Sequence, residues 1–276
     1  CTLTFYDFFA LRTIGRNHVP YRIAAMSSFT SYTIGHNIGA TVFTGGAIRF
    51  RIYSDYGLTA IDVAKICFLS GLTFWLGNAT VLGIGMAFHP EAASALDRLP
   101  FWINQLIAFL SLGGILAYLG WLALGRRQLG RNGWKIVLPS ARLTLLQIAI
   151  GVVDLGFCAL AMYILMPRDP FIDFLSLAVI FIMATLLGFA SHAPGSIAVF
   201  DGAMLIALPQ FAPEDVVASI LIFRLLYFVV PFAISLTVMG SREIWYNIVE
   251  PWQAKRRRQR LDMMSAITQK VETPRR

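Results

Sequence analysis

Three charged side chains stand where the surrounding sequence is strongly apolar. Arg224 lies inside the run 222–227, Asp154 lies in the middle of the run 143–165, and Asp201 follows a Pro-Gly break. An arginine at the centre of a bilayer costs about 2.5–3.5 kcal/mol by insertion scales, so it needs a partner, a cavity or an anionic ligand. A guanidinium binds phosphate or carboxylate with two parallel hydrogen bonds. Two interpretations of Arg224 therefore stay open: a clamp for an anionic group, and a structural ion pair with Asp201.

The two acids are candidates for function for the same reason. An ionisable residue within an apolar span is a candidate functional group by default. Asp201 could balance Arg224 or attract a cationic head group. Asp154 has Gln147 two turns earlier on nearly the same helix face, so the alternative for this pair is a hydrogen bond between helices.

Two arginines follow a pair of glycines. Arg49 and Arg51 come shortly after Gly45 and Gly46. A glycine-rich turn beside arginines can hold a phosphate, which makes both arginines candidates for phosphate binding. The alternative is that they only anchor the topology of the chain at the membrane surface.

Polar side chains also gather at two interruptions of apolar sequence. His36 and Asn37 lie in the first, and His192, Pro194 and Gly195 lie in the second. Each group could line a polar cavity. The alternative for a lone histidine is a hydrogen-bonded filler of the protein interior.

The composition places these residues in a membrane protein. Of 276 residues, 57% are hydrophobic and only 14% are charged, whereas a soluble domain carries about 25% charged residues. The net charge of +8 could suggest nucleic-acid binding. We reject that interpretation because the basic residues lie between apolar runs and in the tail, where they set topology and contact anionic lipids.

Four apolar runs are long enough to cross the hydrocarbon core, which takes about 20 residues. They cover residues 66–88, 103–124, 143–165 and 216–239. Two further apolar stretches, 23–48 and 174–208, are each broken in the middle by Gly, Pro or His. Irregular backbone is tolerated at membrane depth only inside protein or beside a watery cavity.

The charges indicate how these segments are oriented. All but three of the 23 basic residues fall in four regions: before residue 23, between 49 and 65, between 126 and 142, and from 242 to the end. The positive-inside rule places these regions in the cytoplasm, the C-terminus included. Both broken stretches must then enter and leave on one side, from opposite faces, as in inverted-topology repeats. The expected fold is an all-α polytopic transmembrane bundle with two opposed re-entrant or broken-helix hairpins; the alternative is two ordinary short helices with a Gly kink.

These motifs, taken in order, resemble those of a known family. The first is His36-Asn37-Ile38-Gly39 followed by Gly45-Gly46-Ala47-Ile48-Arg49 and Tyr53, the second runs from His192 to Asp201, and the third is Phe223-Arg224-Leu225-Leu226-Tyr227 with Pro231. Over residues 5–245 the chain resembles the membrane region of lysylphosphatidylglycerol synthase/flippase proteins of the multiple peptide resistance factor type. The second motif of that family reads H-x-P-G-G-x-G-x-x-E. Here Ser196 and Ala198 replace two of its glycines, and Asp201 stands where Glu is usual.

The resemblance implies an integral protein of the bacterial inner membrane that binds and translocates an anionic or aminoacylated phospholipid. Arg49 and Arg224 would hold phosphate, and Asp201 and Asp154 would receive a cationic head group. The soluble domain that transfers lysine in such proteins has no room after residue 248, so synthase activity is not expected. The alternatives are a membrane transferase acting on lipid-linked substrates, with Asp201 or His192 as general base, and a non-catalytic subunit of a lipid or glycan synthase.

The remaining expectations concern the ends and the partners of the chain. Residues 1–248 are expected to form the transmembrane domain and 249–276 a basic cytoplasmic tail. Because the chain begins with Cys1 rather than Met, we expect sequence to precede it.

Cys1, Cys67 and Cys158 have no metal-binding spacing, and no disulfide framework is expected. The sequence has no nucleotide-binding or zinc-hydrolase motif, and we expect no cofactor, no metal and no nucleic acid, with a homodimer or a synthase as a partner.

Overall fold

The fold is described from a computed structural model of residues 1–276, in which all residues except 1, 126–127, 130–135, 192 and 246–276 are described. The described residues form α-helices, two 3₁₀ helices (η1, η2), a π-helical turn (η3) and a two-residue antiparallel ladder. The elements are α1 (Thr4–Thr13), α2 (Tyr21–Ile38), α3 (Thr41–Tyr53), η1 (Ser54–Tyr56), α4 (Ala60–Phe88), α5 (Pro90–Asp97), α6 (Phe101–Ala123), β1 (Gln128–Leu129), β2 (Ile136–Val137), α7 (Ala141–Leu165), α8 (Phe174–Ala190), η2 (Pro194–Ser196), α9 (Val199–Ala207), α10 (Pro213–Arg224), η3 (Leu225–Val229) and α11 (Val230–Ile244).

The chain divides into two units, residues Cys1–Phe232 and Ala233–Arg276. The first unit holds both broken segments and the side chains of interest. The predicted tail, residues 249–276, lies outside the described residues.

The four predicted spans are confirmed as helices long and apolar enough to cross a membrane. They are α4, α6, α7 and the helix that runs from Pro213 to Ile244 through η3. The first begins at Ala60, six residues earlier than its apolar run, because Thr59 and Asp62 form a capping box. The Thr59 hydroxyl accepts a hydrogen bond from the Asp62 amide at 3.3 Å, and the Asp62 carboxylate accepts one from the Thr59 amide at 3.0 Å.

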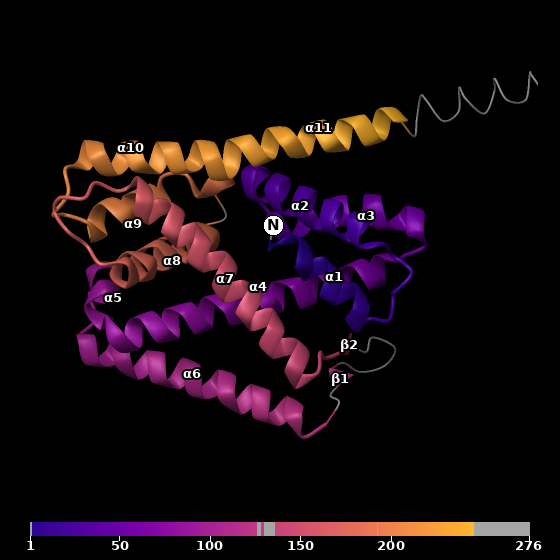
Figure 1. The fold of residues 1–276 in the computed structure, drawn as a ribbon, viewed down its shortest axis with the longest axis horizontal. Helices are drawn as coiled ribbons and strands as arrows, with labels where there is room; N and C mark the ends of the chain where they lie inside the picture. Colours follow the sequence, from indigo (N-terminus) through magenta and orange to yellow (C-terminus); the bar gives the residue numbers. More distant parts are fainter. Residues whose placement is uncertain (1, 126–127, 130–135, 192, 246–276) are drawn as a thin grey trace, which may run out of the picture. The chain divides into compact units, whose positions relative to one another are not determined.

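Both broken stretches fold as helical hairpins within an all-helical bundle, which confirms the predicted fold class. In the first, α2 and α3 pack side by side; in the second, α8 packs on α9. Figure 1 shows the two hairpins in opposite halves of the first unit, with their tips pointing toward its centre, while α4, α6 and α7 run through both halves. The second tip, η2, contacts α2. The position of the hairpins relative to a membrane stays a prediction.

The position of the first turn differs from the expectation. The helix α2 continues through His36 and Asn37 and ends at Gly39 and Ala40, whose φ angles are +89° and +48°. A positive φ costs least at glycine, so Gly39 is where the helix can reverse. His36 is therefore a residue of the last helical turn rather than of the break itself.

The expected Gly-rich turn at Gly45 and Gly46 is wrong, since both residues lie within α3. The reason for glycine there is close helix packing. A Cβ atom on Gly45 would stand 3.2 Å from the Ser31 carbonyl oxygen of α2. The backbone amides at this position are used within the helix, so they form no phosphate-binding turn.

The first helix of the second hairpin, α8, is largely surrounded by protein. Residues of α8 such as Leu177, Val179, Ile182 and Ala184 are almost completely buried. They pack with α5, α7, α9 and α10 in the main apolar core. In the break that follows α8, Gly195 and Ser196 are half-buried, whereas Pro194, Ile197 and Ala198 are exposed.

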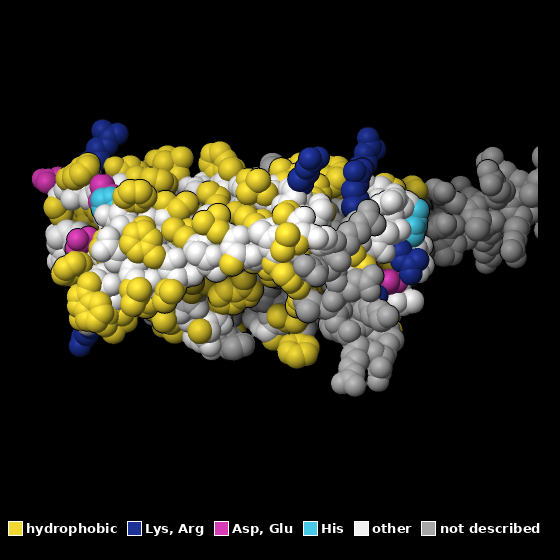
Figure 2. All heavy atoms as spheres, turned by 90° about the horizontal axis from the view of Figure 1, so that it is seen from below, with side chains coloured by type: hydrophobic (Ala, Val, Ile, Leu, Met, Phe, Trp, Pro, Cys, Tyr) yellow, Lys and Arg dark blue, Asp and Glu magenta, His cyan; other side chains and the backbone are white. Residues whose placement is uncertain are grey.

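The helix α6, unlike α8, exposes many of its large apolar side chains. Among its large apolar side chains, Trp102, Leu106, Phe109, Leu110 and Leu116 are all more than half exposed. Figure 2 shows apolar side chains covering the middle of one face, with charged side chains gathered nearer its ends. Such an apolar band is the surface that hydrocarbon chains contact.

The two longest helices of the first unit cross at a pair of glycines. A Cβ on Gly77 of α4 would lie 3.0 Å from Cα of Gly151 in α7. Because the opposing atoms are backbone, we expect Gly77→Ala to separate the helices and to cost about 1–3 kcal/mol in the free energy of unfolding. Thermal unfolding in detergent measures the effect. Gly71→Ala, on the same helix with no atom within 4 Å of its Cβ, is the control and should not lower the transition.

Candidate functional site

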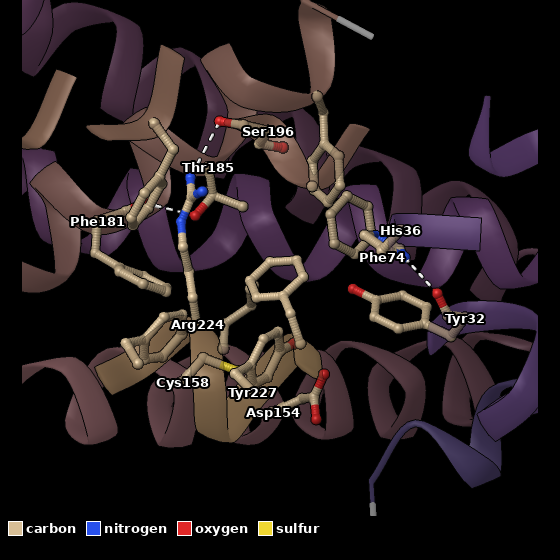
Figure 3. A pocket seen from close by; sticks show the side chains of 16 residues that line it. Tyr32, His36, Phe74, Asp154, Cys158, Phe181, Thr185, Ser196, Arg224 and Tyr227 are labelled. Carbon is tan, nitrogen blue, oxygen red and sulfur yellow. Dashed lines mark hydrogen bonds between the residues drawn. The ribbon is translucent and has the colours of Figure 1, made fainter. Parts of the chain in front are cut away.

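A cavity lies where the tips of the two hairpins meet the long helices. It has a volume of about 40 Å³, which is room for a few water molecules. Figure 3 shows charged, hydroxyl and aromatic side chains from both hairpins and from the spans pointing into it. The lining residues are Tyr32, His36, Phe74, Asp154, Leu155, Cys158, Phe181, Thr185, Phe189, Gly195, Ser196, Phe200, Phe223, Arg224, Tyr227 and Phe228.

The guanidinium of Arg224 lies at the end of the cavity next to the second hairpin. Its Nη2 atom is 2.8 Å from Oδ1 of Asp201, so the expected ion pair is present. The same nitrogen donates to the Ser196 carbonyl oxygen at 3.5 Å. Only 17% of the Arg224 side chain is exposed, which makes the pair stronger than one at the surface. Because Arg224 also lines the cavity, the same guanidinium can pair with Asp201 and face an anion in the cavity.

Asp201 also caps the helix α9. Its Oδ2 atom accepts a hydrogen bond from the Ala198 amide at 3.1 Å. The carboxylate thus fixes the start of α9 with one oxygen and holds Arg224 with the other. The hairpin tip and the long span are coupled through this one side chain.

The loop that carries Gly195 has an unusual backbone. Gly195, Ser196 and Ala198 all have positive φ, of +61°, +54° and +68°. The family motif resembled by this segment has glycine at the last two of these positions, and the conformation explains why. The loop also lies directly on α8, because a Cβ on Gly188 would be 2.5 Å from the Ser196 Cβ.

We expect the substitution Ala198→Gly to stabilise the protein. A non-glycine residue held at positive φ stores about 1–3 kcal/mol of strain, which glycine removes. The midpoint of thermal unfolding in detergent should therefore rise. Ala193→Gly, in the same loop at an ordinary φ of −67°, should instead lower it, because glycine adds freedom to the unfolded chain. An equal fall for both variants would show that Ala198 is not strained.

The first hairpin contributes aromatic and amide groups. The centre of the His36 ring lies 3.8 Å from that of Tyr32, with the two rings tilted by 31°, and the His36 ring meets Phe189 of the second hairpin edge-on at 5.0 Å. Its Nδ1 atom lies 2.7 Å from the Tyr32 carbonyl oxygen. Asn37 does not line the cavity but donates to the carbonyl oxygen of Phe228 at 3.4 Å, which ties α2 to η3.

Asp154 and Tyr227 line the other end of the cavity. The Asp154 carboxylate accepts a hydrogen bond from the hydroxyl of Thr2, and Tyr227 stacks on Phe223 at 5.1 Å. The cavity thus has a guanidinium toward one end and a carboxyl group toward the other, separated by aromatic rings. Gln147, two turns before Asp154, is buried and does not line it.

The structure places Arg49 and Arg51 elsewhere. Arg49 donates to both carboxylate oxygens of Asp7 in α1, at 2.9–3.1 Å. Tyr53 and Ser70 also donate to Asp7, at 2.9 and 3.2 Å. Asp7 is completely buried. Arg51 is 3.7 Å from Asp55 at the surface.

Five of the predicted site residues therefore line one cavity: His36, Asp154, Gly195, Arg224 and Tyr227. Asp201, Asn37 and Pro194 lie beside it, Arg49 and Arg51 lie apart from it, and His192 is outside the described residues.

Two kinds of residue were missed by the sequence analysis. The first is Asp7, the partner of Arg49, although an acid within the apolar run 5–10 was the signal that could have found it. The second is the aromatic lining, including Tyr32, Phe74 and Phe189. Aromatic residues are common throughout the chain. The aromatic residues that line the cavity differ from the others only in their positions on the helices.

Comparison with known proteins gives distant relatives, all of which cover most of this chain. The uncharacterized protein slr0712 of Synechocystis is 28% identical over 88% of this chain and 75% of its own length. The inner membrane protein YbhN of Escherichia coli is 26% identical over 84% of this chain and 72% of its own length. The phosphatidylglycerol lysyltransferase of Staphylococcus aureus is 26% identical over 75% of this chain, a match that spans 24% of that protein. No family model matches the chain.

These relatives and the four apolar helices agree on the class of protein. The chain is an integral, multi-pass membrane protein, broadly related to YbhN and to the lysyltransferase. The predicted resemblance is thus confirmed at the level of a broad relationship. Of the three cysteines, Cys67 and Cys158 are free thiols.

Proposed function

We propose that this chain binds phospholipid head groups in the cavity around Arg224 and moves them between the leaflets of the bacterial inner membrane. The observation that carries the proposal is the guanidinium of Arg224, 17% exposed, in a cavity where two opposed hairpins meet. Opposed hairpins whose broken ends converge are the architecture of membrane transport sites. A guanidinium is the side chain best suited to a phosphate in such a place.

The size of the cavity implies how transport would proceed. A volume of about 40 Å³ is too small for a phospholipid head group. The present arrangement is then a closed one, and a head group enters when the hairpins move apart from the long helices. Entry would replace Asp201 by a phosphate as the partner of Arg224, so the guanidinium stays paired throughout.

The charges give an orientation. The loops near Arg16, Arg51 and Arg142 are basic, whereas those near Glu91 and Glu214 hold more acidic than basic residues. The basic side faces the cytoplasm by the positive-inside rule, together with the C-terminus. Residues 1–248 would then form the lipid-transporting domain, and the basic tail 249–276 would contact anionic lipids of the inner leaflet.

The name of one relative suggests the first lipid to test. The Staphylococcus aureus protein is a phosphatidylglycerol lysyltransferase, and phosphatidylglycerol has the phosphate that Arg224 would bind. Purified protein is reconstituted in vesicles that contain fluorescent phosphatidylglycerol, and exchange between leaflets is followed by chemical quenching of the outer leaflet. We expect faster exchange than in protein-free vesicles. An equal rate would overturn the proposal.

A cavity-filling variant makes the test specific. Thr185 lines the cavity, so Thr185→Trp should slow exchange strongly. Leu187→Trp, on the exposed face of the same helix, should leave it unchanged. Mass spectrometry of the recovered lipid identifies any chemically altered product, which would indicate a transferase instead.

A further inference from the structure

The carboxyl group of Asp154 is a second ionisable group in the cavity, and its surroundings differ from those of Asp201. Asp154 lies in the middle of α7 and accepts a hydrogen bond from Thr2. Among the residues that the structure describes, no Arg, Lys or His forms an ion pair with it. Asp201, by contrast, is paired with Arg224 at 2.8 Å.

Among the described residues, the titratable side chains that interact with Asp154 are three tyrosine hydroxyls and a thiol. They belong to Tyr6 of α1, Tyr32 of α2, Cys158 one turn further along α7, and Tyr227 of η3. Each is close enough to interact electrostatically with Asp154. Figure 3 shows Tyr32, Tyr227 and Cys158 around the same end of the cavity. Hydroxyl groups donate and accept hydrogen bonds, so they can pass a proton.

An acid in this position changes charge when its access to water changes. A carboxylate without a cationic partner costs free energy in a space poor in water, whereas a protonated carboxyl does not. Opening the cavity to one aqueous side allows a proton to leave or arrive, and closing it favours the neutral group. The guanidinium of Arg224 does not have this freedom, because it stays protonated.

Arg224, the second charged group of the cavity, determines whether the proton and the head group move in the same direction. An anionic phosphate at Arg224 would share the cavity with Asp154. Like charges in a low-dielectric space repel strongly, so the phosphate binds more readily when Asp154 holds a proton. Proton and anionic head group would then enter together and leave together.

We propose that Asp154 carries a proton together with each anionic head group, so that a proton gradient drives lipid translocation. The inference rests on the proposed function and adds its energy source. One proton accompanies one phosphate monoanion, so the step is electroneutral, and no covalent bond is formed or broken. His36 lines the same cavity, with its Nδ1 2.7 Å from the Tyr32 carbonyl oxygen, and the step assigned to Asp154 does not involve it.

The test applies a pH gradient to vesicles of phosphatidylcholine that contain the protein and fluorescent phosphatidylglycerol. We expect the label to accumulate in the leaflet on the alkaline side, with a limit of about tenfold per pH unit for one proton per lipid. A pH-sensitive dye inside the vesicles should report proton movement that depends on phosphatidylglycerol. Asp154→Asn should exchange lipid without accumulation, and Asp154→Glu should restore accumulation.

The exposed loop acid Asp169 provides the control, since Asp169→Asn should accumulate label as the parent does. Unbiased exchange by the parent protein, or accumulation by Asp154→Asn, would overturn proton coupling while leaving lipid exchange intact. Absence of any exchange without a gradient would instead overturn the proposed function, and this inference with it. Asp154→Glu and the dye measurement on the parent protein decide the question even if Asp154→Asn does not fold.

Discussion

Replacing Arg224 with Gln is expected to slow phospholipid exchange about 10- to 100-fold. A hydrogen bond to a charged group contributes about 1.5–3 kcal/mol, and each 1.4 kcal/mol corresponds to a factor of ten. Glutamine keeps the two N–H donors of one amide group but neither the charge nor the forked geometry of a guanidinium. Arg224→Lys retains the charge alone, so its rate should lie between those of Gln and the parent protein. The vesicle assay with fluorescent phosphatidylglycerol gives the three rates.

The control for Arg224 is another arginine outside the cavity. Arg22 is exposed in the first turn of α2, and Arg22→Gln should exchange lipid at the parent rate. Thermal unfolding shows whether each variant is folded, since removal of Arg224 also leaves Asp201 without its cation. A folded Arg224→Gln variant with the parent rate would mean that the guanidinium is a structural partner of Asp201 and holds no phosphate.

Breaking the buried pair between Asp7 and Arg49 is expected to cost about 3–5 kcal/mol in the free energy of unfolding. Asp7 is completely buried and accepts hydrogen bonds from Arg49, Tyr53 and Ser70. Asp7→Leu would leave the guanidinium of Arg49 buried without its counter-charge. Arg49→Met would strand the carboxylate in the same way. Unfolding by sodium dodecyl sulfate in mixed micelles measures both losses.

The double variant separates the cost of an unpaired charge from the value of the pair. Apolar residues that replace both partners of a buried pair are often neutral, so Asp7→Leu with Arg49→Met should recover more than half of the loss. Arg51→Met, at a pair that is 44% exposed on the arginine side, should change stability by less than about 1 kcal/mol. Losses that simply add in the double variant would show that the two side chains are not coupled.

The two ion pairs have corresponding places in the two hairpins. Arg49 belongs to α3 of the first hairpin and pairs with α1, and Asp201 belongs to α9 of the second hairpin and pairs with α10. They differ in surroundings, because the first is enclosed by hydroxyl donors and the second opens on the cavity. This difference is the physical basis for expecting a stability defect from one pair and a transport defect from the other.

The amino-acid sequence by itself determined the class of the protein and the helices that are long and apolar enough to span a membrane. The backbone N–H and C=O groups of a long apolar run find all their hydrogen-bond partners in lipid when the run forms a helix. The spans therefore followed from composition and length. The unequal distribution of basic residues, together with the Gly and Pro breaks, was sufficient to predict two opposed hairpins. Arg224, Asp154 and Asp201 were recognisable because a charge within an apolar run is costly wherever it lies.

Only the tertiary structure decided which of these charges share a site. Arg49 and Arg224 are both candidates for phosphate binding in the sequence, yet Arg49 is enclosed with Asp7 and Arg224 lines the cavity. Their partners lie 42 and 23 residues away along the chain. Gly45 resembles a turn residue in the sequence but serves the close contact of α2 with α3. Ion pairing and helix contact depend on distances across the fold, and the periodicity of one segment contains no information about the segment packed against it.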